Sequence, residues 1–236
     1  MKKIIHIFLS ALLLLLLHVT ANAQRFSAGI TAGLVATDVH NSDIYDNDDD
    51  FHKAGFMLGG AVSTPLSEKI TFRFELNYIQ KGTQQPGDSL GNDFYRFSFN
   101  YLEFPLLVKY RIHFNVSKKP VKGFELHAGI SYGKLLQNTA EGDNFFQAND
   151  DTRYNTNDVS LLGGLGYRFA THFTFTVRYS NSLISVFKQN SDPYGFGGPT
   201  FNNGNNMVFH FVLQLQFGAV PKNTTAPPAE ENNSGN

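Results

Sequence analysis

Three side chains with the chemistry of a nucleophilic catalyst lie close together in one segment. Glu125, His127 and Ser131 are two and four residues apart, and this spacing places them on one face of a β-strand. A serine beside a histidine that a carboxylate orients is the arrangement of a nucleophilic hydrolase. The alternating pattern of the chain, however, puts this face inside a narrow barrel, out of reach of a lipid substrate. We therefore interpret the group as a hydrogen-bonded interior cluster, interpret His210 with Gln214 in the same way, and predict no catalytic residue.

An acidic run has some features of a cation site. Asp46, Asp48 and Asp50 alternate as in a calcium-binding loop. Phe51 stands where the EF-hand loop requires glycine, and Met57 stands where it requires a bidentate glutamate. The segment 193–206, although rich in glycine, lacks the spacing of a phosphate-binding loop. We predict a loop that attracts cations loosely, with no dedicated metal site and no cofactor.

Large charged side chains form a third group, because they recur at the polar positions of alternating segments. They are Arg73, Glu75, Glu103, Lys109, Arg111, Glu125, Arg168 and Arg178. Inside a narrow eight-stranded barrel, charges of opposite sign can meet across the interior and neutralise one another. We predict that these residues form an ion-paired network that fills the interior and leaves no pore.

The elements that must position these residues are segments in which polar and apolar residues alternate with a period of two. They cover residues 25–37, 53–64, 70–80, 97–111, 124–136, 159–169, 173–183 and 207–217. An even number of strands is what an up-and-down antiparallel barrel requires. We therefore predict an all-β protein, an eight-stranded antiparallel up-and-down transmembrane barrel over residues 24–218.

The fourth segment contains two irregularities. Its apolar residues occupy even positions from Leu102 onward, whereas Phe97 and Phe99 occupy odd ones, which predicts a bulge or a strand that rises out of the membrane. Pro105 cannot donate a hydrogen bond to a neighbouring strand. We expect a second bulge there, which turns Glu103 toward the interior.

The connections alternate between short and long. The chain turns within a few residues at 65–69 and 170–172 and over a modest loop at 117–122, whereas residues 38–52, 81–95, 137–158 and 184–206 form long connections. Short turns on one rim and long loops on the other are typical of outer-membrane barrels, whose long loops lie outside the cell. Most of the 20 acidic residues fall on the long-loop side, Asp158 among them.

Alternation alone does not decide whether the apolar face points outward. A secreted lipocalin also has eight strands, and its apolar side chains line a ligand cup. The membrane interpretation is favoured by the charged residues of the polar face, by the last strand and by aromatic residues near strand ends, which suit interfacial girdles. These aromatic residues are Phe26, Phe72, Tyr78, Tyr110, Phe124, Tyr132, Tyr167, Phe169, Phe173, Tyr179 and Phe217.

Both ends of the sequence lie outside the predicted barrel. Lys2 and Lys3 precede an apolar stretch that ends in small residues at Ala21 and Ala23, which predicts a cleaved signal peptide over residues 1–23. Residues 219–236 contain almost nothing to bury, and we predict a disordered tail. The chain has no cysteine, which excludes disulfides and a lipid-anchored amino terminus. A net charge of −1 without a basic run argues against nucleic acid as a partner.

Several stretches together resemble a known family. The glycine-rich FSAGITAGL, the segment GFMLGGAVSTPLSEKITFRFELNYIQKG and above all YLEFPLLVKY are similar to the PorT-like outer-membrane β-barrel proteins of Bacteroidota-type bacteria. The resemblance covers nearly the whole mature chain and implies the fold and a location in the bacterial outer membrane. The founding member of that family is implicated in type IX protein secretion.

From these observations we predict a non-enzymatic scaffold that presents its loops outside the cell. The alternatives are an accessory component of a secretion system, a soluble periplasmic ligand-binding barrel and a lipid-modifying enzyme. The expected partners are outer-membrane lipid and lipopolysaccharide, the outer-membrane assembly machinery that reads the last strand, and proteins that contact the loops.

Overall fold

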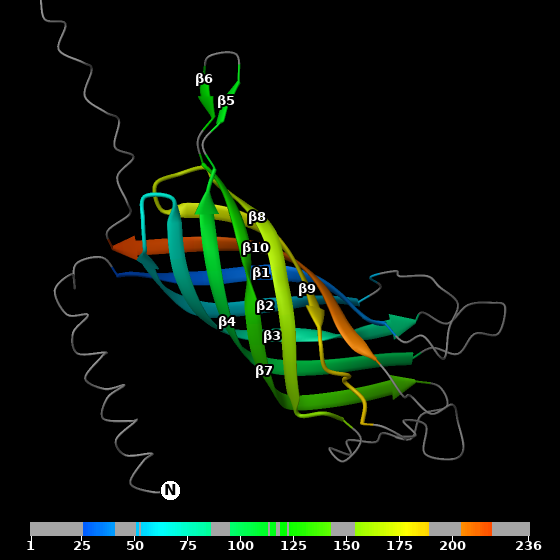
Figure 1. Ribbon diagram of the computed structural model, residues 1–236. Helices are drawn as coiled ribbons and strands as arrows, with labels where there is room; N and C mark the ends of the chain where they lie inside the picture. The colour runs from blue at the N-terminus through cyan, green and yellow to red at the C-terminus, as the bar shows by residue number, and fades with distance from the viewer. Residues whose placement is uncertain are drawn as a thin grey trace, which may run out of the picture.

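A computed structural model describes residues 26–40, 51, 53–85, 95–112, 114–116, 119–121, 123–142, 154–188 and 204–218 of the 236-residue chain (Figure 1). The predicted signal peptide, the carboxy-terminal tail and the acidic run 46–50 lie outside these residues. No described residue belongs to a helix long and apolar enough to cross a membrane.

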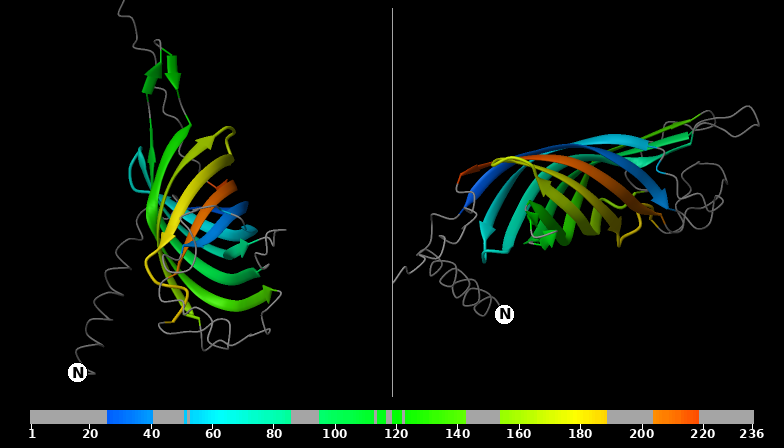
Figure 2. Two further views of the ribbon diagram at one scale, coloured as in Figure 1. Left: turned by 90° about the vertical axis from the view of Figure 1, so that its right-hand side faces the viewer. Right: turned by 90° about the horizontal axis from the view of Figure 1, so that it is seen from above.

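The described residues form a closed barrel of eight antiparallel strands. The strands are β1 (Ser27–His40), β2 (Lys53–Pro65), β3 (Ile70–Gln85), β4 (Tyr95–Arg111), β7 (Phe124–Gly142), β8 (Asn157–Arg168), β9 (Phe173–Ser182) and β10 (Asn205–Gly218). Each strand pairs with its neighbours in the sequence of barrel strands, and β1 pairs with β10 to close the ring (Figure 1). Figure 2 shows from two further directions how the strands wrap around one interior. The predicted fold class is confirmed.

The two rims of the barrel differ in the length of the connections between strands, as predicted. Residues 66–69 and 169–172 connect β2 to β3 and β8 to β9 on one rim, which we call the short-turn rim. On this rim β4 continues into a small hairpin of β5 (Phe114–Val116) and β6 (Lys119–Val121), which projects from the barrel (Figure 1). The opposite end, the long-loop rim, holds the connections after β1, β3, β7 and β9.

Strands β3, β4 and β7 extend further toward the long-loop rim than the sequence pattern indicated. β3 continues to Gln85, β4 begins at Tyr95 and β7 continues to Gly142, so these strands extend further at the long-loop rim than their neighbours (Figure 1). Part of what was predicted to be loop is therefore strand.

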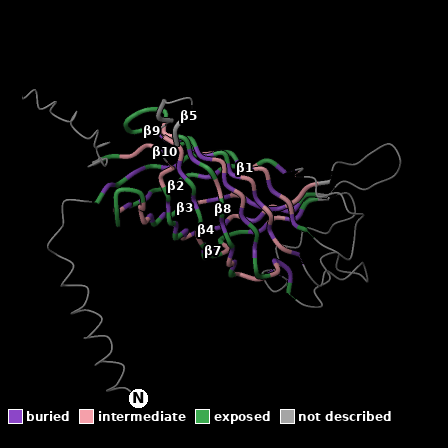
Figure 3. The backbone as a smooth tube through the Cα atoms, turned by 45° about the horizontal axis from the view of Figure 1, so that its top comes forward, coloured by how far each residue is buried: buried purple, intermediate pink, exposed green. Residues whose placement is uncertain are grey.

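The apolar face of the barrel points outward. Ile30, Leu76, Ile130, Leu165 and Leu213, one from each of five strands, are between 43% and 54% exposed, and buried and exposed positions alternate along the strands (Figure 3). The alternating positions, which carry serine, threonine and charged residues, face the interior and are buried. The alternative of a soluble lipocalin-like barrel is therefore wrong, because that fold needs its apolar side chains inside.

The change of parity in β4 coincides with a bulge, as predicted, but the bulge is not what moves the apolar residues from odd to even positions. The inward-facing positions of β4 continue without a break, since all of them are buried: Phe97, Phe99, Tyr101 and Glu103. The alternation of the strand is therefore preserved, and the inward-facing side chains change from aromatic to charged. A register shift does occur at Asn100 and Tyr101, but the extra residue is Leu136 on β7, which lies between the partners Leu135 and Gln137.

The predicted bulge at Pro105 is wrong. The pairing of β3 with β4 stops at Phe74 and Leu106 and resumes at Asn77 and Glu103, with equal numbers of residues on both strands. Because proline lacks an N–H group, the ladder is interrupted without any change of register. Ordinary alternation turns Glu103 inward, where it is 2% exposed.

Because the apolar face points outward, the cost of placing a charged side chain on it should depend on the position along the strand. Ile130→Arg, in the apolar part of β7, is expected to lower the free energy of unfolding in lipid vesicles by about 2–4 kcal/mol, because the guanidinium would lie in hydrocarbon. Ser98→Arg, on the outward face of β4 near the long-loop rim, is the matched control, with an expected cost of about 0–1 kcal/mol. Urea titration of both variants measures the difference, and equal costs would contradict the orientation of the two faces.

Candidate functional site

The centre of the barrel interior contains a carboxylate between two guanidinium groups. Glu75 on β3 is completely buried. Arg178 on β9 donates two hydrogen bonds to it, from Nη1 to Oε2 and from Nη2 to Oε1, both of 2.8 Å. Arg73 donates from Nε to Oε1 at 2.6 Å, and Asn77 donates from Nδ2 to Oε2 at 3.0 Å. Both carboxylate oxygens therefore have charge-assisted partners, which is the condition for keeping a buried charge.

The pair of Glu75 and Arg178 spans the barrel. In the closed strand order β3 and β9 are four strands apart in either direction, so the two side chains start from opposite walls. Thr31 on β1 extends the same layer by donating to Oδ1 of Asn77 at 2.9 Å. Side chains from both walls thus occupy the axis of the barrel.

A second ionic cluster lies nearer the long-loop rim. Lys81 on β3 forms ion pairs with Glu103 on β4 and, at 2.8 Å, with Oδ2 of Asp158 on β8. Ser182 and Ser160 donate to the other oxygen of Asp158. All five residues are buried. Lys81 therefore neutralises two carboxylates that are both shielded from water.

The third cluster lies nearer the short-turn rim. Glu125 on β7 forms two ion pairs. Its Oε2 lies 2.6 Å from Nζ of Lys109 on β4, and its Oε1 lies 2.7 Å from Nη2 of Arg168 on β8. Nε2 of His127 is 3.5 Å from Oε2 of Glu125. Glu125, Lys109 and His127 are buried, while Arg168 is partly exposed toward the rim.

The predicted network residues thus fall into separate groups. Arg73, Glu75 and Arg178 meet in the central cluster, and Lys109, Glu125 and Arg168 meet in the cluster near the short-turn rim. Glu103 joins neither group and pairs with Lys81 instead. Arg111 is half-buried and forms no ion pair with any residue that the structure describes.

The sequence interpretation missed Lys81 and Asp158, which it assigned to long connections. Both continue the inward-facing positions of their strands, two residues beyond Ile79 and two before Ser160. An apolar residue at the inward position 79 concealed the continuation of β3. The preserved period of two was the signal that would have located both residues.

An aromatic cap covers the charged layers toward the long-loop rim. Phe97 and Phe99 of β4 contact Tyr154 and Phe187, with ring centroids 5.2 Å apart for Phe99 and Tyr154 and 6.1 Å apart for Phe97 and Phe187. Tyr154 and Phe187 form an isolated β-bridge, and Asn155 donates to the Val186 carbonyl at 2.7 Å. The segments around Tyr154 and Phe187 therefore lie together over the interior.

The group of Glu125, His127 and Ser131 is buried in the interior, as predicted, but the predicted hydrogen bonds of His127 are not formed with described residues, and the group is not a catalytic triad. All three are 3% exposed, and no hydrogen bond between described residues joins His127 to Ser131. His210 contacts Ser180, at 2.9 Å, rather than Gln214. Among the described residues, no group of histidine and acidic side chains has the arrangement of a metal site.

A closed eight-stranded barrel with an apolar outside, a charged inside and two unequal rims defines the class of integral outer-membrane proteins. Residues 21–188 match the family described as outer membrane protein beta-barrel domain, and the chain belongs to this family. The protein is therefore located in the bacterial outer membrane, with its short turns facing the periplasm and its long loops facing outward.

Solved structures with a similar fold are distant in sequence. Ail, the attachment invasion locus protein of Yersinia pestis, is 12% identical, with a TM-score of 0.44 over 82% of this chain and 99% of Ail. Neisserial surface protein A is 13% identical, with a TM-score of 0.42 over 81% and 97% of the two chains. OprG of Pseudomonas aeruginosa is 12% identical, with a TM-score of 0.36 over 83% and 98%. No curated protein matches the sequence.

The central cluster predicts strong coupling between Glu75 and Arg178. Glu75→Gln and Arg178→Gln are each expected to lower the free energy of unfolding by about 3–5 kcal/mol, because the first leaves two buried guanidinium groups without a carboxylate and the second removes one of the two guanidinium groups that neutralise Glu75. The double variant is expected to lose clearly less than the sum of the two single losses. Urea titrations of the four proteins in lipid vesicles measure this coupling.

The exposed turn residues Glu68 and Lys69 provide a matched pair of control positions. Glu68→Gln and Lys69→Gln are expected to change stability by no more than about 0.5 kcal/mol each and to be additive. Additive losses at Glu75 and Arg178 would contradict the buried ion pair.

Proposed function

We propose that the protein is a non-enzymatic scaffold of the outer membrane, with a sealed interior and with loops presented outside the cell. The observation that carries this proposal is the bond between Glu75 and Arg178 across the barrel. A layer of side chains bonded from wall to wall leaves no continuous path along the axis.

The layers on either side support the sealed interior. The pairs of Lys81 with Asp158 and of Lys109 with Glu125 join different strands above and below Glu75, and the aromatic cap covers them toward the outside. An eight-stranded barrel is just wide enough for its own side chains to fill. Ion pairs therefore take the place that a hydrophobic core occupies in a soluble protein.

The burial of the nucleophilic and basic side chains supports a non-enzymatic role. Ser131, His127, Ser180 and His210 are all at most 3% exposed and face the interior, whereas a lipid substrate would approach from the outer surface. A group that acts on lipid must reach the reacting bond, and these groups do not.

The long strands support the presentation of loops. On the outward faces of β3 and β4 the apolar residues Tyr78 and Leu102 are followed toward the long-loop rim by Gln80, Asn100 and Arg96. This polar surface is suited to water rather than to hydrocarbon. We propose that β3, β4 and β7 extend beyond the membrane and carry their connecting loops toward a protein or lipopolysaccharide partner.

A sealed interior predicts the absence of large conductance. Mature protein purified from outer membranes and reconstituted in planar bilayers is expected to show no steps of nanosiemens size, because its interior is filled. A 16-stranded porin in the same bilayers provides the positive control, and a band that shifts only after boiling in gel electrophoresis establishes that the sample is folded. Nanosiemens steps from the folded protein would contradict the proposal.

The similarity of YLEFPLLVKY to PorT-like proteins supports a second candidate, an accessory role in protein secretion. Under this proposal, deletion of the gene is expected to reduce the proteins released into the medium, and the wild-type gene is expected to restore them. Proteomic comparison of culture supernatants measures the effect. An unchanged supernatant would leave the scaffold role and exclude the secretion role.

A further inference from the structure

A hydrogen-bonded group of polar side chains lies on the outer surface of the barrel, and the sealed interior does not involve it. Lys134 on β7 and Asn157 on β8 are exposed and lie directly opposite one another in the strand pairing. Nζ of Lys134 donates to Oγ1 of Thr156 at 3.0 Å and to Oδ1 of Asn157 at 3.3 Å. The hydroxyl group of Tyr132 donates to the same Oδ1 at 2.8 Å. We call these four residues the surface cluster.

The hydrogen bonds within the surface cluster leave donors available. Its one side-chain carbonyl oxygen, Oδ1 of Asn157, already accepts from two donors. An ammonium group carries three hydrogens, an amide nitrogen two and a hydroxyl group one. No hydrogen bond to a described residue uses the third hydrogen of Lys134, Nδ2 of Asn157 or the hydroxyl hydrogen of Thr156. The surface cluster is therefore suited to a ligand that accepts hydrogen bonds.

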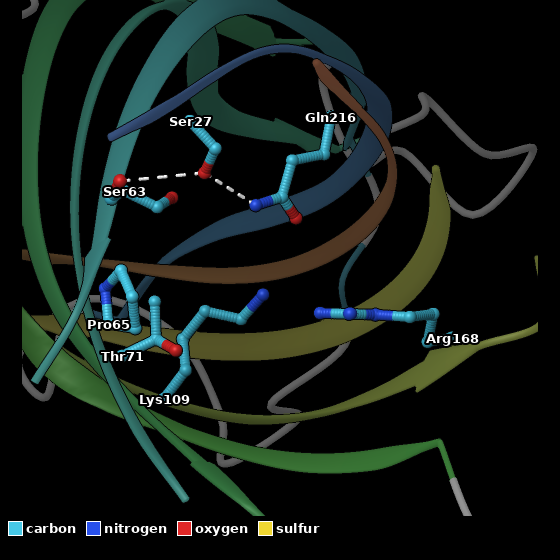
Figure 4. Close-up of a pocket in the computed structure, with 7 residues that line it drawn as sticks. All are labelled: Ser27, Ser63, Pro65, Thr71, Lys109, Arg168 and Gln216. Atoms are coloured by element: carbon cyan, nitrogen blue, oxygen red, sulfur yellow. Dashed lines mark hydrogen bonds between the residues drawn. The ribbon is translucent and has the colours of Figure 1, made fainter. Parts of the chain in front are cut away.

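The charge of Lys134 also lacks a counterpart, because this lysine forms no ion pair with any residue that the structure describes. The cations of the short-turn rim provide a contrast. Lys109 and Arg168 direct their charged ends toward one another inside the barrel (Figure 4), and both pair with Glu125. An ammonium group whose hydrogen-bond partners are all neutral attracts an anion. The ligand that suits the surface cluster is therefore an anion with several acceptor oxygens.

The surface cluster lies where the apolar outer face of the barrel ends. Tyr132, one outward position below Lys134 on β7, is 45% exposed. Lys134 pairs with Leu102 of β4, and the next outward residue of β4 toward the long-loop rim is Asn100. Apart from the bulge residue Leu136, the outward positions of β4 and β7 beyond this level are polar. This level corresponds to the headgroups of the outer leaflet, where tyrosine and lysine side chains meet lipid phosphates.

We propose that the surface cluster binds the phosphate group of a lipid in the outer leaflet. Lys134 supplies the positive charge, and Asn157 and Thr156 supply neutral donors. Tyr132 fixes the amide of Asn157 by donating to its Oδ1, and the acyl chains of the lipid lie along the apolar face below. This inference deepens the proposed scaffold role and rests on it, because it names lipid phosphate as a partner of the long-loop side.

Native mass spectrometry of the full mature protein, released from maltoside micelles, tests this site. The probe is bisphosphorylated lipid A, and the same lipid without its phosphates is the comparison. Saturable binding of the phosphorylated form is expected, with an affinity at least about tenfold higher than that of the dephosphorylated form. Lys134→Gln is expected to remove about this factor, because one charge-assisted contact is lost.

Two further variants separate a binding role from a structural one. Asn157→Asp keeps the size of the side chain but replaces a donor by a negative charge that would pair with Lys134 and repel phosphate. It is expected to weaken binding of the phosphorylated lipid and to leave binding of the dephosphorylated lipid unchanged. Lys134→Arg keeps the charge and is expected to retain the affinity of the wild type. A purely structural role would not depend on the phosphate.

Lys69→Gln is the matched control, since it removes one positive charge at an exposed position of the opposite rim. Boiling-dependent migration on gels establishes that each variant is folded. Equal affinities of Lys134→Gln and Lys69→Gln, or equal binding of the two forms of lipid A, would overturn the proposal. Displacement of the lipid by inorganic phosphate at equal concentration would also overturn it, because the site would then bind a free ion.

Planar-bilayer recordings of Lys134→Gln distinguish failure of this site from failure of the scaffold role. The variant is expected to show no nanosiemens steps, because Lys134 lies on the outer surface. Silent bilayers together with a lost preference for phosphorylated lipid A in the wild type would overturn the lipid site and leave the sealed scaffold intact.

Discussion

The buried charge of Glu75 is the constraint on which the rest of the interior depends. Removing a carboxylate from water costs several kcal/mol, and only well-placed partners offset that cost. Two arginines from opposite walls supply them, which ties β3 to β9 across the barrel. On the neighbouring strand β8, Gly164 allows the backbone of β9 to approach closely, since a Cβ there would lie 2.8 Å from Cα of Arg178 and 2.9 Å from its Cγ. The position of one carboxylate thus determines which side chains meet at the centre of the barrel.

The barrel interior contains two kinds of layer, one of ion-paired side chains and one of aromatic side chains. The ion-paired layers occupy the part of the barrel surrounded by the outward apolar face, where they replace a hydrophobic core. The aromatic cap around Phe99 and Phe187 lies where β3, β4 and β7 extend toward the outside. Its rings pack against one another on the long-loop side of the charged layers. The periplasmic end has no such cap among its described residues, and there Lys109 and Arg168 both pair with Glu125.

Much of the fold could be predicted from the sequence, because the period of two is a local property of a strand. It indicated all eight strands, the closed antiparallel barrel and the two unequal rims, and the charged residues of the polar face favoured the outward orientation of the apolar face. The strand ends were less well predicted. An inward-facing Ile79 concealed the continuation to Lys81, and an apparent shift at Tyr101 reflected a change in the chemistry of the interior, while the extra residue, Leu136, lies on β7.

What the sequence determined by itself was which side chains face inward, since this depends only on the parity of positions along each strand. Which of them meet was decided by the tertiary structure. Glu75 and Arg178 are 103 residues apart, and nothing in either segment indicates that their strands are opposite in the closed ring. The same holds for Glu103, which pairs with Lys81 rather than with another predicted residue. Ion pairing across a barrel depends on closure and on the relative height of distant strands, and these properties exist only once the barrel has formed.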